Sequence, residues 1–143
     1  MYYKVSKGLL DCPDAKLLRE TVFIKEQQFK NEFDDIDKKS VHVVAYENNK
    51  PIATARYYSD DDRIYHIGRI AVDKQMRGKR VGEKIVSFCE QRISDLGAKA
   101  IVLSAQERVK GFYHKLGYNE YGDTYMDEHV PHIKMKKEFG KSL

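Results

Sequence analysis

Short segments in which apolar residues alternate with polar ones, or run together, divide the chain into expected strands and helices. This pattern predicts strands at residues 2–7, 41–47, 51–59, 63–72 and 98–105, and final strands within 118–126 and 132–135. The run at 98–105 is continuously apolar, which is typical of a strand buried on both faces. Asn48-Asn49 lies between two of these segments and predicts a tight turn.

Three further segments carry apolar residues at helical spacing. The first helix should begin at Pro13-Asp14 and end near Gln27, because proline suits a first turn and an acidic residue suits its positive end. Its expected apolar face consists of Leu17, Leu18, Thr21, Val22 and Ile24. A second helix begins near Val81 and ends before Gly97, and a third covers residues 107–116. Residues 29–39, which are mostly polar, predict a loop or a short irregular helix.

Length and composition favour one compact domain over residues 1–143. The net charge of +4 is modest and the basic residues form no uninterrupted stripe, so a nucleic-acid binder is not the first expectation. We find no apolar run of membrane-spanning length and no signal-peptide pattern, and expect no membrane partner. Cys12 and Cys89 lack metal-ligand spacing, which predicts free thiols, a cytoplasmic location and no bound metal.

Residues 67–86 carry the strongest functional signal in the chain. They predict a strand, a short basic loop with two glycines, and a helix. Such a loop presents backbone N–H groups in a concave nest, and the N-terminus of the following helix points at the same place. Arg77, Lys79 and Arg80 add positive charge, so the pattern indicates a pyrophosphate site, with a basic surface turn as the alternative. The loop lacks the Ser or Thr of a Walker motif after Gly82, and the Gly-x-Gly-x-x-Gly of a dinucleotide fold.

The loop resembles the acetyl-CoA loop of the GNAT superfamily of N-acyltransferases, written Arg/Gln-x-x-Gly-x-Gly/Ala. Arg77 and Gly82 match the two ends of this motif, while Arg80 replaces its middle glycine. The order of expected elements is also that of the superfamily. The segments at 18–27, 35–37, 103–106 and 126–135, together with His42, are similar to the ElaA-type and YjcF-type branch. The resemblance implies an α/β fold of the mixed α+β kind, a single domain whose central, largely antiparallel sheet is flanked by helices.

For the acyl donor, the resemblance implies a site for acetyl-CoA as cosubstrate. The backbone at Ile70, Ala71 and Val72 would pair with the pantetheine arm like an added strand, and one of its N–H groups would bind the developing oxyanion. Gln106, at the end of a strand, would contact the same arm. The pyrophosphate would be bound by Arg77, Gly78, Lys79, Arg80, Val81, Gly82 and Glu83.

The run Gly111-Phe112-Tyr113-His114-Lys115-Leu116-Gly117 resembles the superfamily segment Phe-Tyr-x-Lys-x-Gly. The resemblance implies that Tyr113 protonates the departing CoA thiolate, a role that a neutral phenol can perform. The alternative is that Tyr113 is a core aromatic of a short helix. No residue has the setting of a covalent nucleophile, which favours direct attack by the acceptor amine.

An amine acceptor must also lose a proton before it attacks, because its ordinary pKa is near 10.4. We expect His66 to be the base, since alternation along the strand would place His66, Gly68 and Ile70 on one face. His132 and the acidic residues of the first helix and the loop after it are further candidates, and His66 could instead be a half-exposed residue at a strand end.

The sequence thus predicts an N-acetyltransferase that acts on a primary amine of a small molecule or a protein. A CoA-binding sensor or partner protein without catalysis is the alternative, and a basic nucleic-acid binder is a weaker one. The sequence does not decide the acceptor or the oligomeric state, and a homodimer is left open.

Overall fold

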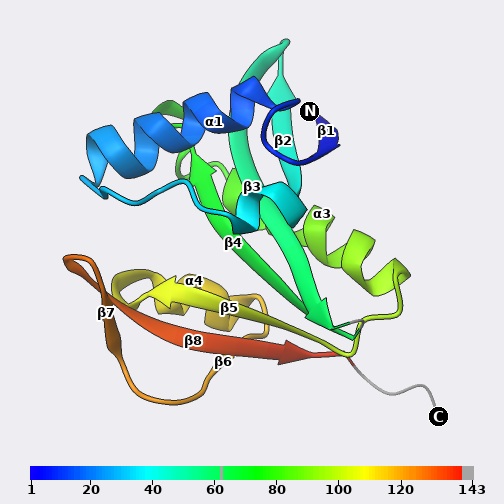
Figure 1. The fold of residues 1–143 in the computed structure, drawn as a ribbon, viewed down its shortest axis with the longest axis vertical. Coiled ribbons are helices and arrows are strands. Elements are labelled where there is room, and N and C mark those ends of the chain that lie inside the picture. The colour runs from blue at the N-terminus through cyan, green and yellow to red at the C-terminus, as the bar shows by residue number, and fades with distance from the viewer. Residues whose placement is uncertain (62, 140–143) are drawn as a thin grey trace. The chain divides into compact units, whose positions relative to one another are not determined.

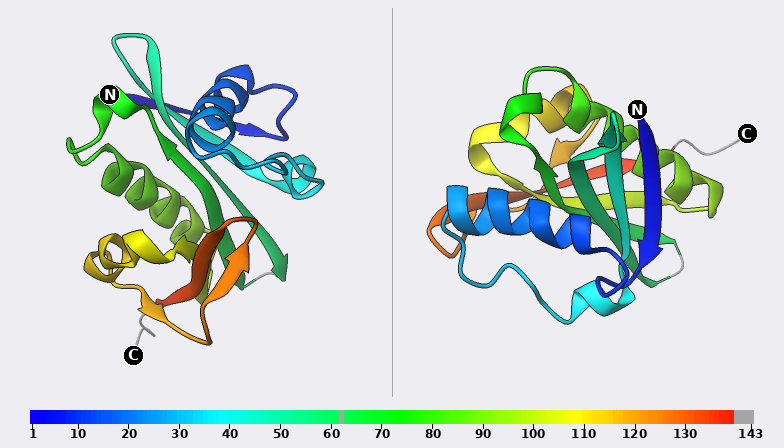
Figure 2. Two further views of the ribbon diagram at one scale, coloured as in Figure 1. Left: turned by 90° about the vertical axis from the view of Figure 1, so that its left-hand side faces the viewer. Right: turned by 90° about the horizontal axis from the view of Figure 1, so that it is seen from above.

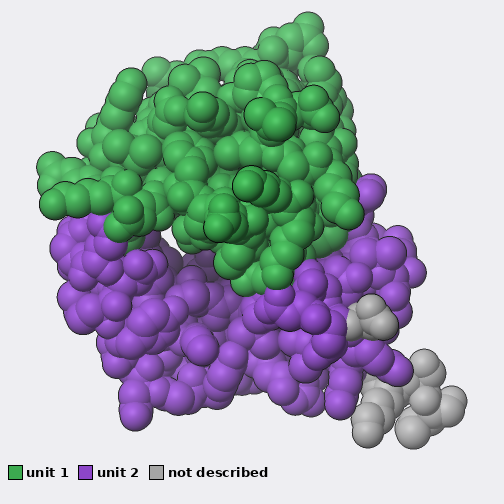
Figure 3. Space-filling view, viewed as in Figure 1, with its two compact units in different colours: residues 1–58, 67–89 green, residues 59–66, 90–143 purple. Residues whose placement is uncertain are grey.

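The computed structural model describes residues 1–61 and 63–139, and the last four positions of the expected domain lie outside this range (Figure 1). The chain divides into two compact units (Figure 3). Unit 1 comprises residues 1–58 and 67–89, and unit 2 comprises residues 59–66 and 90–143. The single domain over residues 1–143 remains a prediction.

Eight strands of the described residues belong to one hydrogen-bonded sheet, in the order β1-β2-β3-β4-β5-β8-β6, with β7 paired to β8. Antiparallel pairs dominate, and β4 with β5 is a parallel pair. The expected mixed sheet flanked by helices is confirmed. The strands are β1 Tyr2–Lys7, β2 Val41–Glu47, β3 Lys50–Asp61, β4 Ile64–Val72, β5 Ala100–Gln106, β6 Asn119–Glu120, β7 Tyr125–Asp127 and β8 Val130–Glu138.

The helical segments follow the same order along the chain. None of them, in the part of the chain that the structure describes, has the length and apolar character needed to cross a bilayer. They are α1 Pro13–Arg19, the π-helix η1 Glu20–Glu26, α2 Ile36–Lys39, the 3₁₀ turn η2 Lys74–Met76, α3 Val81–Asp95, the 3₁₀ turn η3 Glu107–Val109 and α4 Lys110–Lys115.

In unit 1, β2 and β3 form a hairpin around the predicted turn. Asn48 and Asn49 both have positive φ, at 52° and 62°, as a two-residue type I′ turn requires. Helices cover both faces of these strands (Figure 2). One face buries Val44 and Tyr46 against α1, in a cluster with Cys12, Ala15 and Leu18. On the opposite face Tyr3 stacks on Phe88 of α3, with ring centroids 4.1 Å apart.

The first helix differs from the prediction in its second half, because it continues from α1 into the π-helix η1. The Gln27 N–H donates to the Val22 carbonyl oxygen, a separation of five residues, at 3.0 Å. The wider turn buries Val22 and Phe23 together, whereas Leu17 and Thr21 of the expected apolar face are exposed. The prediction of a regular helix with that face was therefore wrong in part.

Strand β4 contains an irregularity that the alternation argument did not foresee. Arg69 has a φ of 50°, a left-handed conformation that interrupts the pleat. Strict alternation therefore does not extend from His66 through Arg69 to Ile70, and the prediction of one shared face for His66, Gly68 and Ile70 loses its basis. The cause is a local backbone conformation at a residue that is not glycine.

Unit 2 is built on β5 and β8, which pair along the whole length of β5, from Ala100↔Glu138 to Gln106↔His132. The first residues of β4 add a parallel strand to β5, from Ile64↔Ala100 to His66↔Val102. Residues 118–126 form two short strands rather than one, β6 and β7, both paired to β8. This segment contains Gly122 at a φ of 79°, which breaks an extended strand.

Candidate functional site

The predicted phosphate loop lies in unit 1 between β4 and α3. The Asp73 carboxylate accepts a hydrogen bond from the Gln75 N–H at 3.0 Å and so starts the turn η2. Gly78 and Arg80 then have left-handed backbones, with φ of 80° and 63°. Arg80 thus adopts the conformation that the motif's glycine would adopt freely, although a residue with a Cβ has to bear strain there.

The N-terminus of α3 follows this turn directly. The Lys84 N–H donates to the Arg80 carbonyl oxygen at 3.0 Å and closes the first helical turn. The preceding N–H groups, at Val81, Gly82 and Glu83, therefore have no acceptor within the helix. Three such donors and the positive end of a 15-residue helix form an environment suited to an anion.

Arg77, which the motif assigns to the pyrophosphate, is paired within the protein. Its guanidinium donates two hydrogen bonds to the Glu26 carboxylate, at 2.5 and 2.9 Å, and a third to the Val72 carbonyl oxygen at 3.2 Å. The Glu26 contact, with burial opposing it, raises the pKa of Arg77. The ion pair joins the end of η1 to the glycine loop, and both side chains remain more than a third exposed.

A pocket of about 430 Å³ also lies in unit 1, along the first turns of α3. Two of the residues that line it, Arg80 and Lys84, are basic, and Tyr3 and Phe88 provide an aromatic wall. Arg80 therefore contributes both to the loop backbone and to this pocket.

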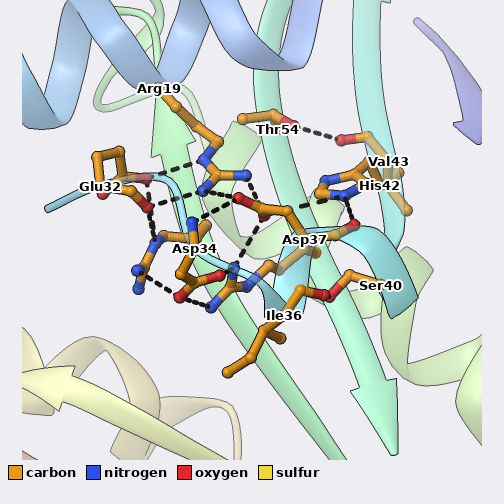
Figure 4. Close-up of polar contacts among 11 residues, drawn as sticks. Arg19, Glu32, Asp34, Ile36, Asp37, Ser40, His42, Val43 and Thr54 are labelled. Carbon is orange, nitrogen blue, oxygen red and sulfur yellow. Dashed lines mark hydrogen bonds and ion pairs between the residues drawn. The ribbon is translucent and has the colours of Figure 1, made fainter. Parts of the chain in front are cut away.

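Beside the left-handed residue of β4, three arginines and three carboxylates form a closed ring of alternating charge. Every arginine bonds two carboxylates and every carboxylate bonds two arginines. The six links are Arg19–Glu32 at 2.8 Å, Glu32–Arg69 at 3.1 Å, Arg69–Asp34 at 3.2 Å, Asp34–Arg56 at 2.7 Å, Arg56–Asp37 at 2.8 Å and Asp37–Arg19 at 2.7 Å. We call these six residues the charged ring; Figure 4 shows its labelled members Arg19, Glu32, Asp34 and Asp37.

The charged ring is largely buried, and its charges balance. Arg19 and Glu32 have 1% and 4% exposed side chains, whereas Asp34 is one-third exposed. Burial raises the pKa of Asp37, but hydrogen bonds and charge from Arg19 and Arg56 outweigh it and lower that pKa to about 2. At Glu32 burial prevails over the arginines and raises the pKa. Because its six residues come from α1, the 29–39 segment, β3 and β4, the ring joins these four parts of unit 1.

His42 lies against the charged ring, fully buried. Its Nε2 is 3.0 Å from the Asp37 carbonyl oxygen, to which it donates, and its Nδ1 has no hydrogen-bond partner among the described residues. Burial lowers the pKa of His42, with the nearby arginines acting in the same direction and Asp37 opposing. The lowered pKa favours the neutral form of the His42 imidazole.

Three predicted site residues lie in unit 2. Tyr113 is 8% exposed, packs edge-on against Tyr118 at 6.1 Å, and has its pKa raised by burial, so its phenol is neutral near pH 7. Gln106 accepts a hydrogen bond from the Arg108 guanidinium at 3.0 Å. His66 Nε2 is 3.8 Å from an Asp60 carboxylate oxygen.

The predicted site residues are thus divided between the two units. Residues 70–72 and 77–83 share unit 1, and His66, Gln106 and Tyr113 share unit 2. The sequence reasoning missed the charged ring, although its members Arg19 and Asp37, and His42 beside it, lie at positions that carried the family resemblance. No pattern in the sequence indicated a role for Arg69, because neither its backbone conformation nor its ion-pair partners follow from neighbouring residues.

Together the mixed sheet and the loop between β4 and α3 define the acyl-CoA N-acyltransferase class of fold. Residues 10–139 match the family described as Acetyltransferase (GNAT) domain, and this chain belongs to that family. The uncharacterized N-acetyltransferase YjcF of Bacillus subtilis is 33% identical over 137 residues, which cover 94% of this chain and 97% of YjcF.

Solved structures show the same fold. The crystal structure of Escherichia coli ElaA has a TM-score of 0.85 and 25% identity, and covers 96% of this chain and 99% of ElaA. An aminoglycoside 6'-N-acetyltransferase, solved in complex with coenzyme A, has a TM-score of 0.75 at 14% identity and covers 97% of this chain and 99% of its own. The second likeness supports the fold alone.

Proposed function

We propose that this protein is an acetyl-CoA-dependent N-acetyltransferase that transfers the acetyl group to a primary amine by direct attack. The observation that carries the proposal is the loop between β4 and α3. It combines left-handed residues at Gly78 and Arg80 with the N-terminus of α3. Family membership supports acyl transfer as the reaction class, and the fold neighbour solved with coenzyme A supports the choice of that ligand.

On this proposal the donor is held mainly by backbone groups. The N–H groups of Val81, Gly82 and Glu83 bind the pyrophosphate, and Lys79 and Arg80 add charge. The backbone of residues 70–72 pairs with the pantetheine arm, and one N–H receives the oxyanion charge. Because the parallel register of β4 with β5 ends at His66, these residues lie beyond that paired segment.

The transfer then needs two proton movements. The acceptor nitrogen must lose a proton before it attacks the thioester carbonyl carbon, and the sulfur must gain one as the C–S bond breaks. Tyr113 is the proposed donor to the sulfur, because its phenol is neutral and belongs to the run that resembles the family segment. Gln106 is proposed to orient the pantetheine arm.

The test combines coenzyme binding with turnover. Thiol release from acetyl-CoA is measured with a panel of primary amines, covering amino sugars, polyamines, amino acids and peptides. We expect amine-dependent release by the parent protein, and loss of CoA binding in Gly82→Val, which adds bulk where the backbone approaches the phosphates. CoA binding without release for any amine would favour the alternative, a CoA-binding sensor protein. Unchanged binding in a folded Gly82→Val variant would contradict the loop assignment.

Cys12 and Cys89 are buried thiols that form no disulfide among the described residues, which supports a cytoplasmic location, since a reducing compartment keeps cysteines in the thiol form. We expect the acceptor to be the variable part of the reaction, because surface loops generally vary more among related proteins than the elements they connect.

A further inference from the structure

We infer that one face of unit 2 forms the acceptor side of the site and that His132 takes the proton from the acceptor amine. This inference rests on the proposed N-acetyltransferase function and assigns a residue to its unassigned step. The residues that carry it are Ser104 and Gln106 of β5, His132 of β8 and Tyr125 of β7. We call these four residues the acceptor face.

Strand register places these side chains together. Gln106 is opposite His132 across β5 and β8, and His132 is opposite Tyr125 across β8 and β7. Residues opposite each other in neighbouring antiparallel strands project to the same face. Ser104 is two residues from Gln106 and so shares that face, and its hydroxyl contacts the Tyr125 hydroxyl. Lys134, opposite Ser104 in the register of β5 and β8, places an exposed cation on the same face.

The exposure of the β5 side chains shows that the acceptor face is the face of this strand that is open to solvent. Leu103 and Ala105, which project to the opposite face, are buried at 4% and 1% exposure. Ser104 between them is exposed, and Tyr125 is 38% exposed. The His132 imidazole lies beside the Tyr125 ring, with centroids 6.1 Å apart and 33° between the ring planes, and His132 is 6% exposed. An acceptor bound at Ser104 and Tyr125 therefore approaches His132 in a partly desolvated setting.

The tautomer of His132 is fixed by its own strand. Nδ1 is 2.9 Å from the Val130 carbonyl oxygen. A carbonyl oxygen only accepts, so Nδ1 carries the hydrogen, and in the neutral ring Nε2 carries the lone pair. A histidine oriented in this way by a backbone carbonyl has the arrangement of a general base.

The reaction balances with His132 in this role. Nε2 takes one proton from the ammonium form of the acceptor, and the neutral nitrogen forms a bond to the thioester carbon. The C–S bond then breaks, the sulfur receives a proton from Tyr113, and the second proton of the attacking nitrogen is lost to water or to the phenolate. The imidazolium returns its proton to solvent, so that the products are an amide, CoA as the thiol and one released proton.

His66 is the competing base, and it lies on the same face of unit 2. It is opposite Val102 in the parallel register of β4 and β5, four residues before Gln106 along β5. At about 3.3 Å per residue, the two histidines are separated by roughly 13 Å along the strand direction. His132 lies beside Gln106, the residue proposed for the pantetheine arm, whereas His66 lies near Asp60. The positions therefore favour His132.

The test is the pH dependence of kcat/KM for an accepted amine in the parent protein, His132→Asn and His66→Asn, with CoA affinity measured in each. Asparagine at position 132 can still donate to the Val130 carbonyl oxygen but cannot take a proton. We expect His132→Asn to lose about 10²–10⁴-fold in kcat/KM near pH 7, with activity rising toward the pKa of the amine, at unchanged CoA affinity. His66→Asn tests the competing base, and on this inference it should retain the fall in activity at low pH.

Two results of this experiment would overturn the inference and leave the proposed function standing. One is a pH profile of kcat/KM in His132→Asn that matches the parent, and the other is loss, in His66→Asn, of the fall in kcat/KM at low pH. Absence of transfer by the parent to any amine would overturn the proposed function and this inference with it. Nitrogen NMR of the His132 imidazole in the parent protein reports its tautomer and provides a second measurement. The Nδ1–H tautomer is expected, and the Nε2–H tautomer would also overturn the inference.

Discussion

Arg69 carries a left-handed backbone in the middle of β4, and its guanidinium bonds the buried Glu32 carboxylate at 3.1 Å. A left-handed conformation at a residue other than glycine costs about 1–3 kcal/mol, and it persists where its surroundings hold it in place. The charged ring supplies that constraint, because Arg69 bonds Asp34 as well. The irregularity lies directly before Ile70, the first residue of the proposed pantetheine strand, so the ring supports the segment that would bind the donor.

The charged ring should make Asp37 and its neighbour Asp35 respond very differently to the same change. Asp37→Asn leaves Arg19 and Arg56 without a shared buried carboxylate, and we expect the free energy of unfolding to fall by about 3–5 kcal/mol. Asp35 pairs with Lys38 at the exposed surface, so Asp35→Asn should leave that free energy unchanged within error. Denaturant unfolding of both variants provides the measurement, and equal effects would contradict the energetic role of the ring.

Acid should destabilise the protein through the same ring. Because Arg19 and Arg56 lower the pKa of Asp37 from 3.8 to about 2 against the effect of burial, the unfolded chain takes up this proton first as the pH falls. The contribution of Asp37, about 2 kcal/mol, is therefore present above about pH 4 and lost as the pH approaches about 2. The lowered pKa of Asp34 acts in the same direction, while the raised pKa of Glu32 opposes it.

This pH dependence is measured by denaturant unfolding between pH 2 and 6. We expect a steeper loss of stability toward low pH in the parent than in Asp37→Asn, which lacks the titrating group. Identical slopes would show that Asp37 titrates in the folded protein as it does in the unfolded chain.

The Arg77–Glu26 pair allows the loop arginine to be assigned with two matched variants. If Arg77 exchanges Glu26 for the pyrophosphate, Arg77→Gln should weaken CoA binding by about 5–30-fold, which corresponds to about 1–2 kcal/mol for one charged contact. Glu26→Gln should leave affinity equal or increase it, since it removes the competing carboxylate. Calorimetric titration with CoA measures the affinity of both variants. Equal losses of affinity in the two variants would mean that the Arg77–Glu26 pair stabilises the loop and that Arg77 does not bind the pyrophosphate.

Tyr113→Phe separates catalysis from packing, because it retains the ring against Tyr118 and removes only the hydroxyl. If Tyr113 protonates the leaving thiolate, kcat should fall by about 10²–10⁴-fold while CoA affinity stays constant. Steady-state rates with an accepted amine decide the point. A kcat equal to that of the parent would make Tyr113 a packing residue and give the proton transfer to water or another group.

The strands were largely predictable because their signals are local. The range of β2 and the turn at Asn48-Asn49 follow from apolar runs on either side of two residues that tolerate positive φ. The glycine loop was predicted from its own residues, and the family resemblance added the expectation that it binds acetyl-CoA. By contrast, the π-helix η1 and the left-handed Arg69 depend on packing and ion pairs with segments that are distant in the sequence. These features therefore cannot be predicted from neighbouring residues. The His132 tautomer likewise depends on a contact that only the folded strand displays.

The most direct test of the account is mass spectrometry of a reaction with acetyl-CoA that carries an isotopically labelled acetyl group. We predict that a primary amine from the panel gains the labelled acetyl group in step with CoA release, while the protein keeps its unmodified mass at all times. Neither product should form in Gly82→Val at a CoA concentration that saturates the parent. A labelled acyl-protein that precedes the product would contradict direct attack, and CoA binding with no labelled amine from any member of the panel would contradict the proposed N-acetyltransferase function.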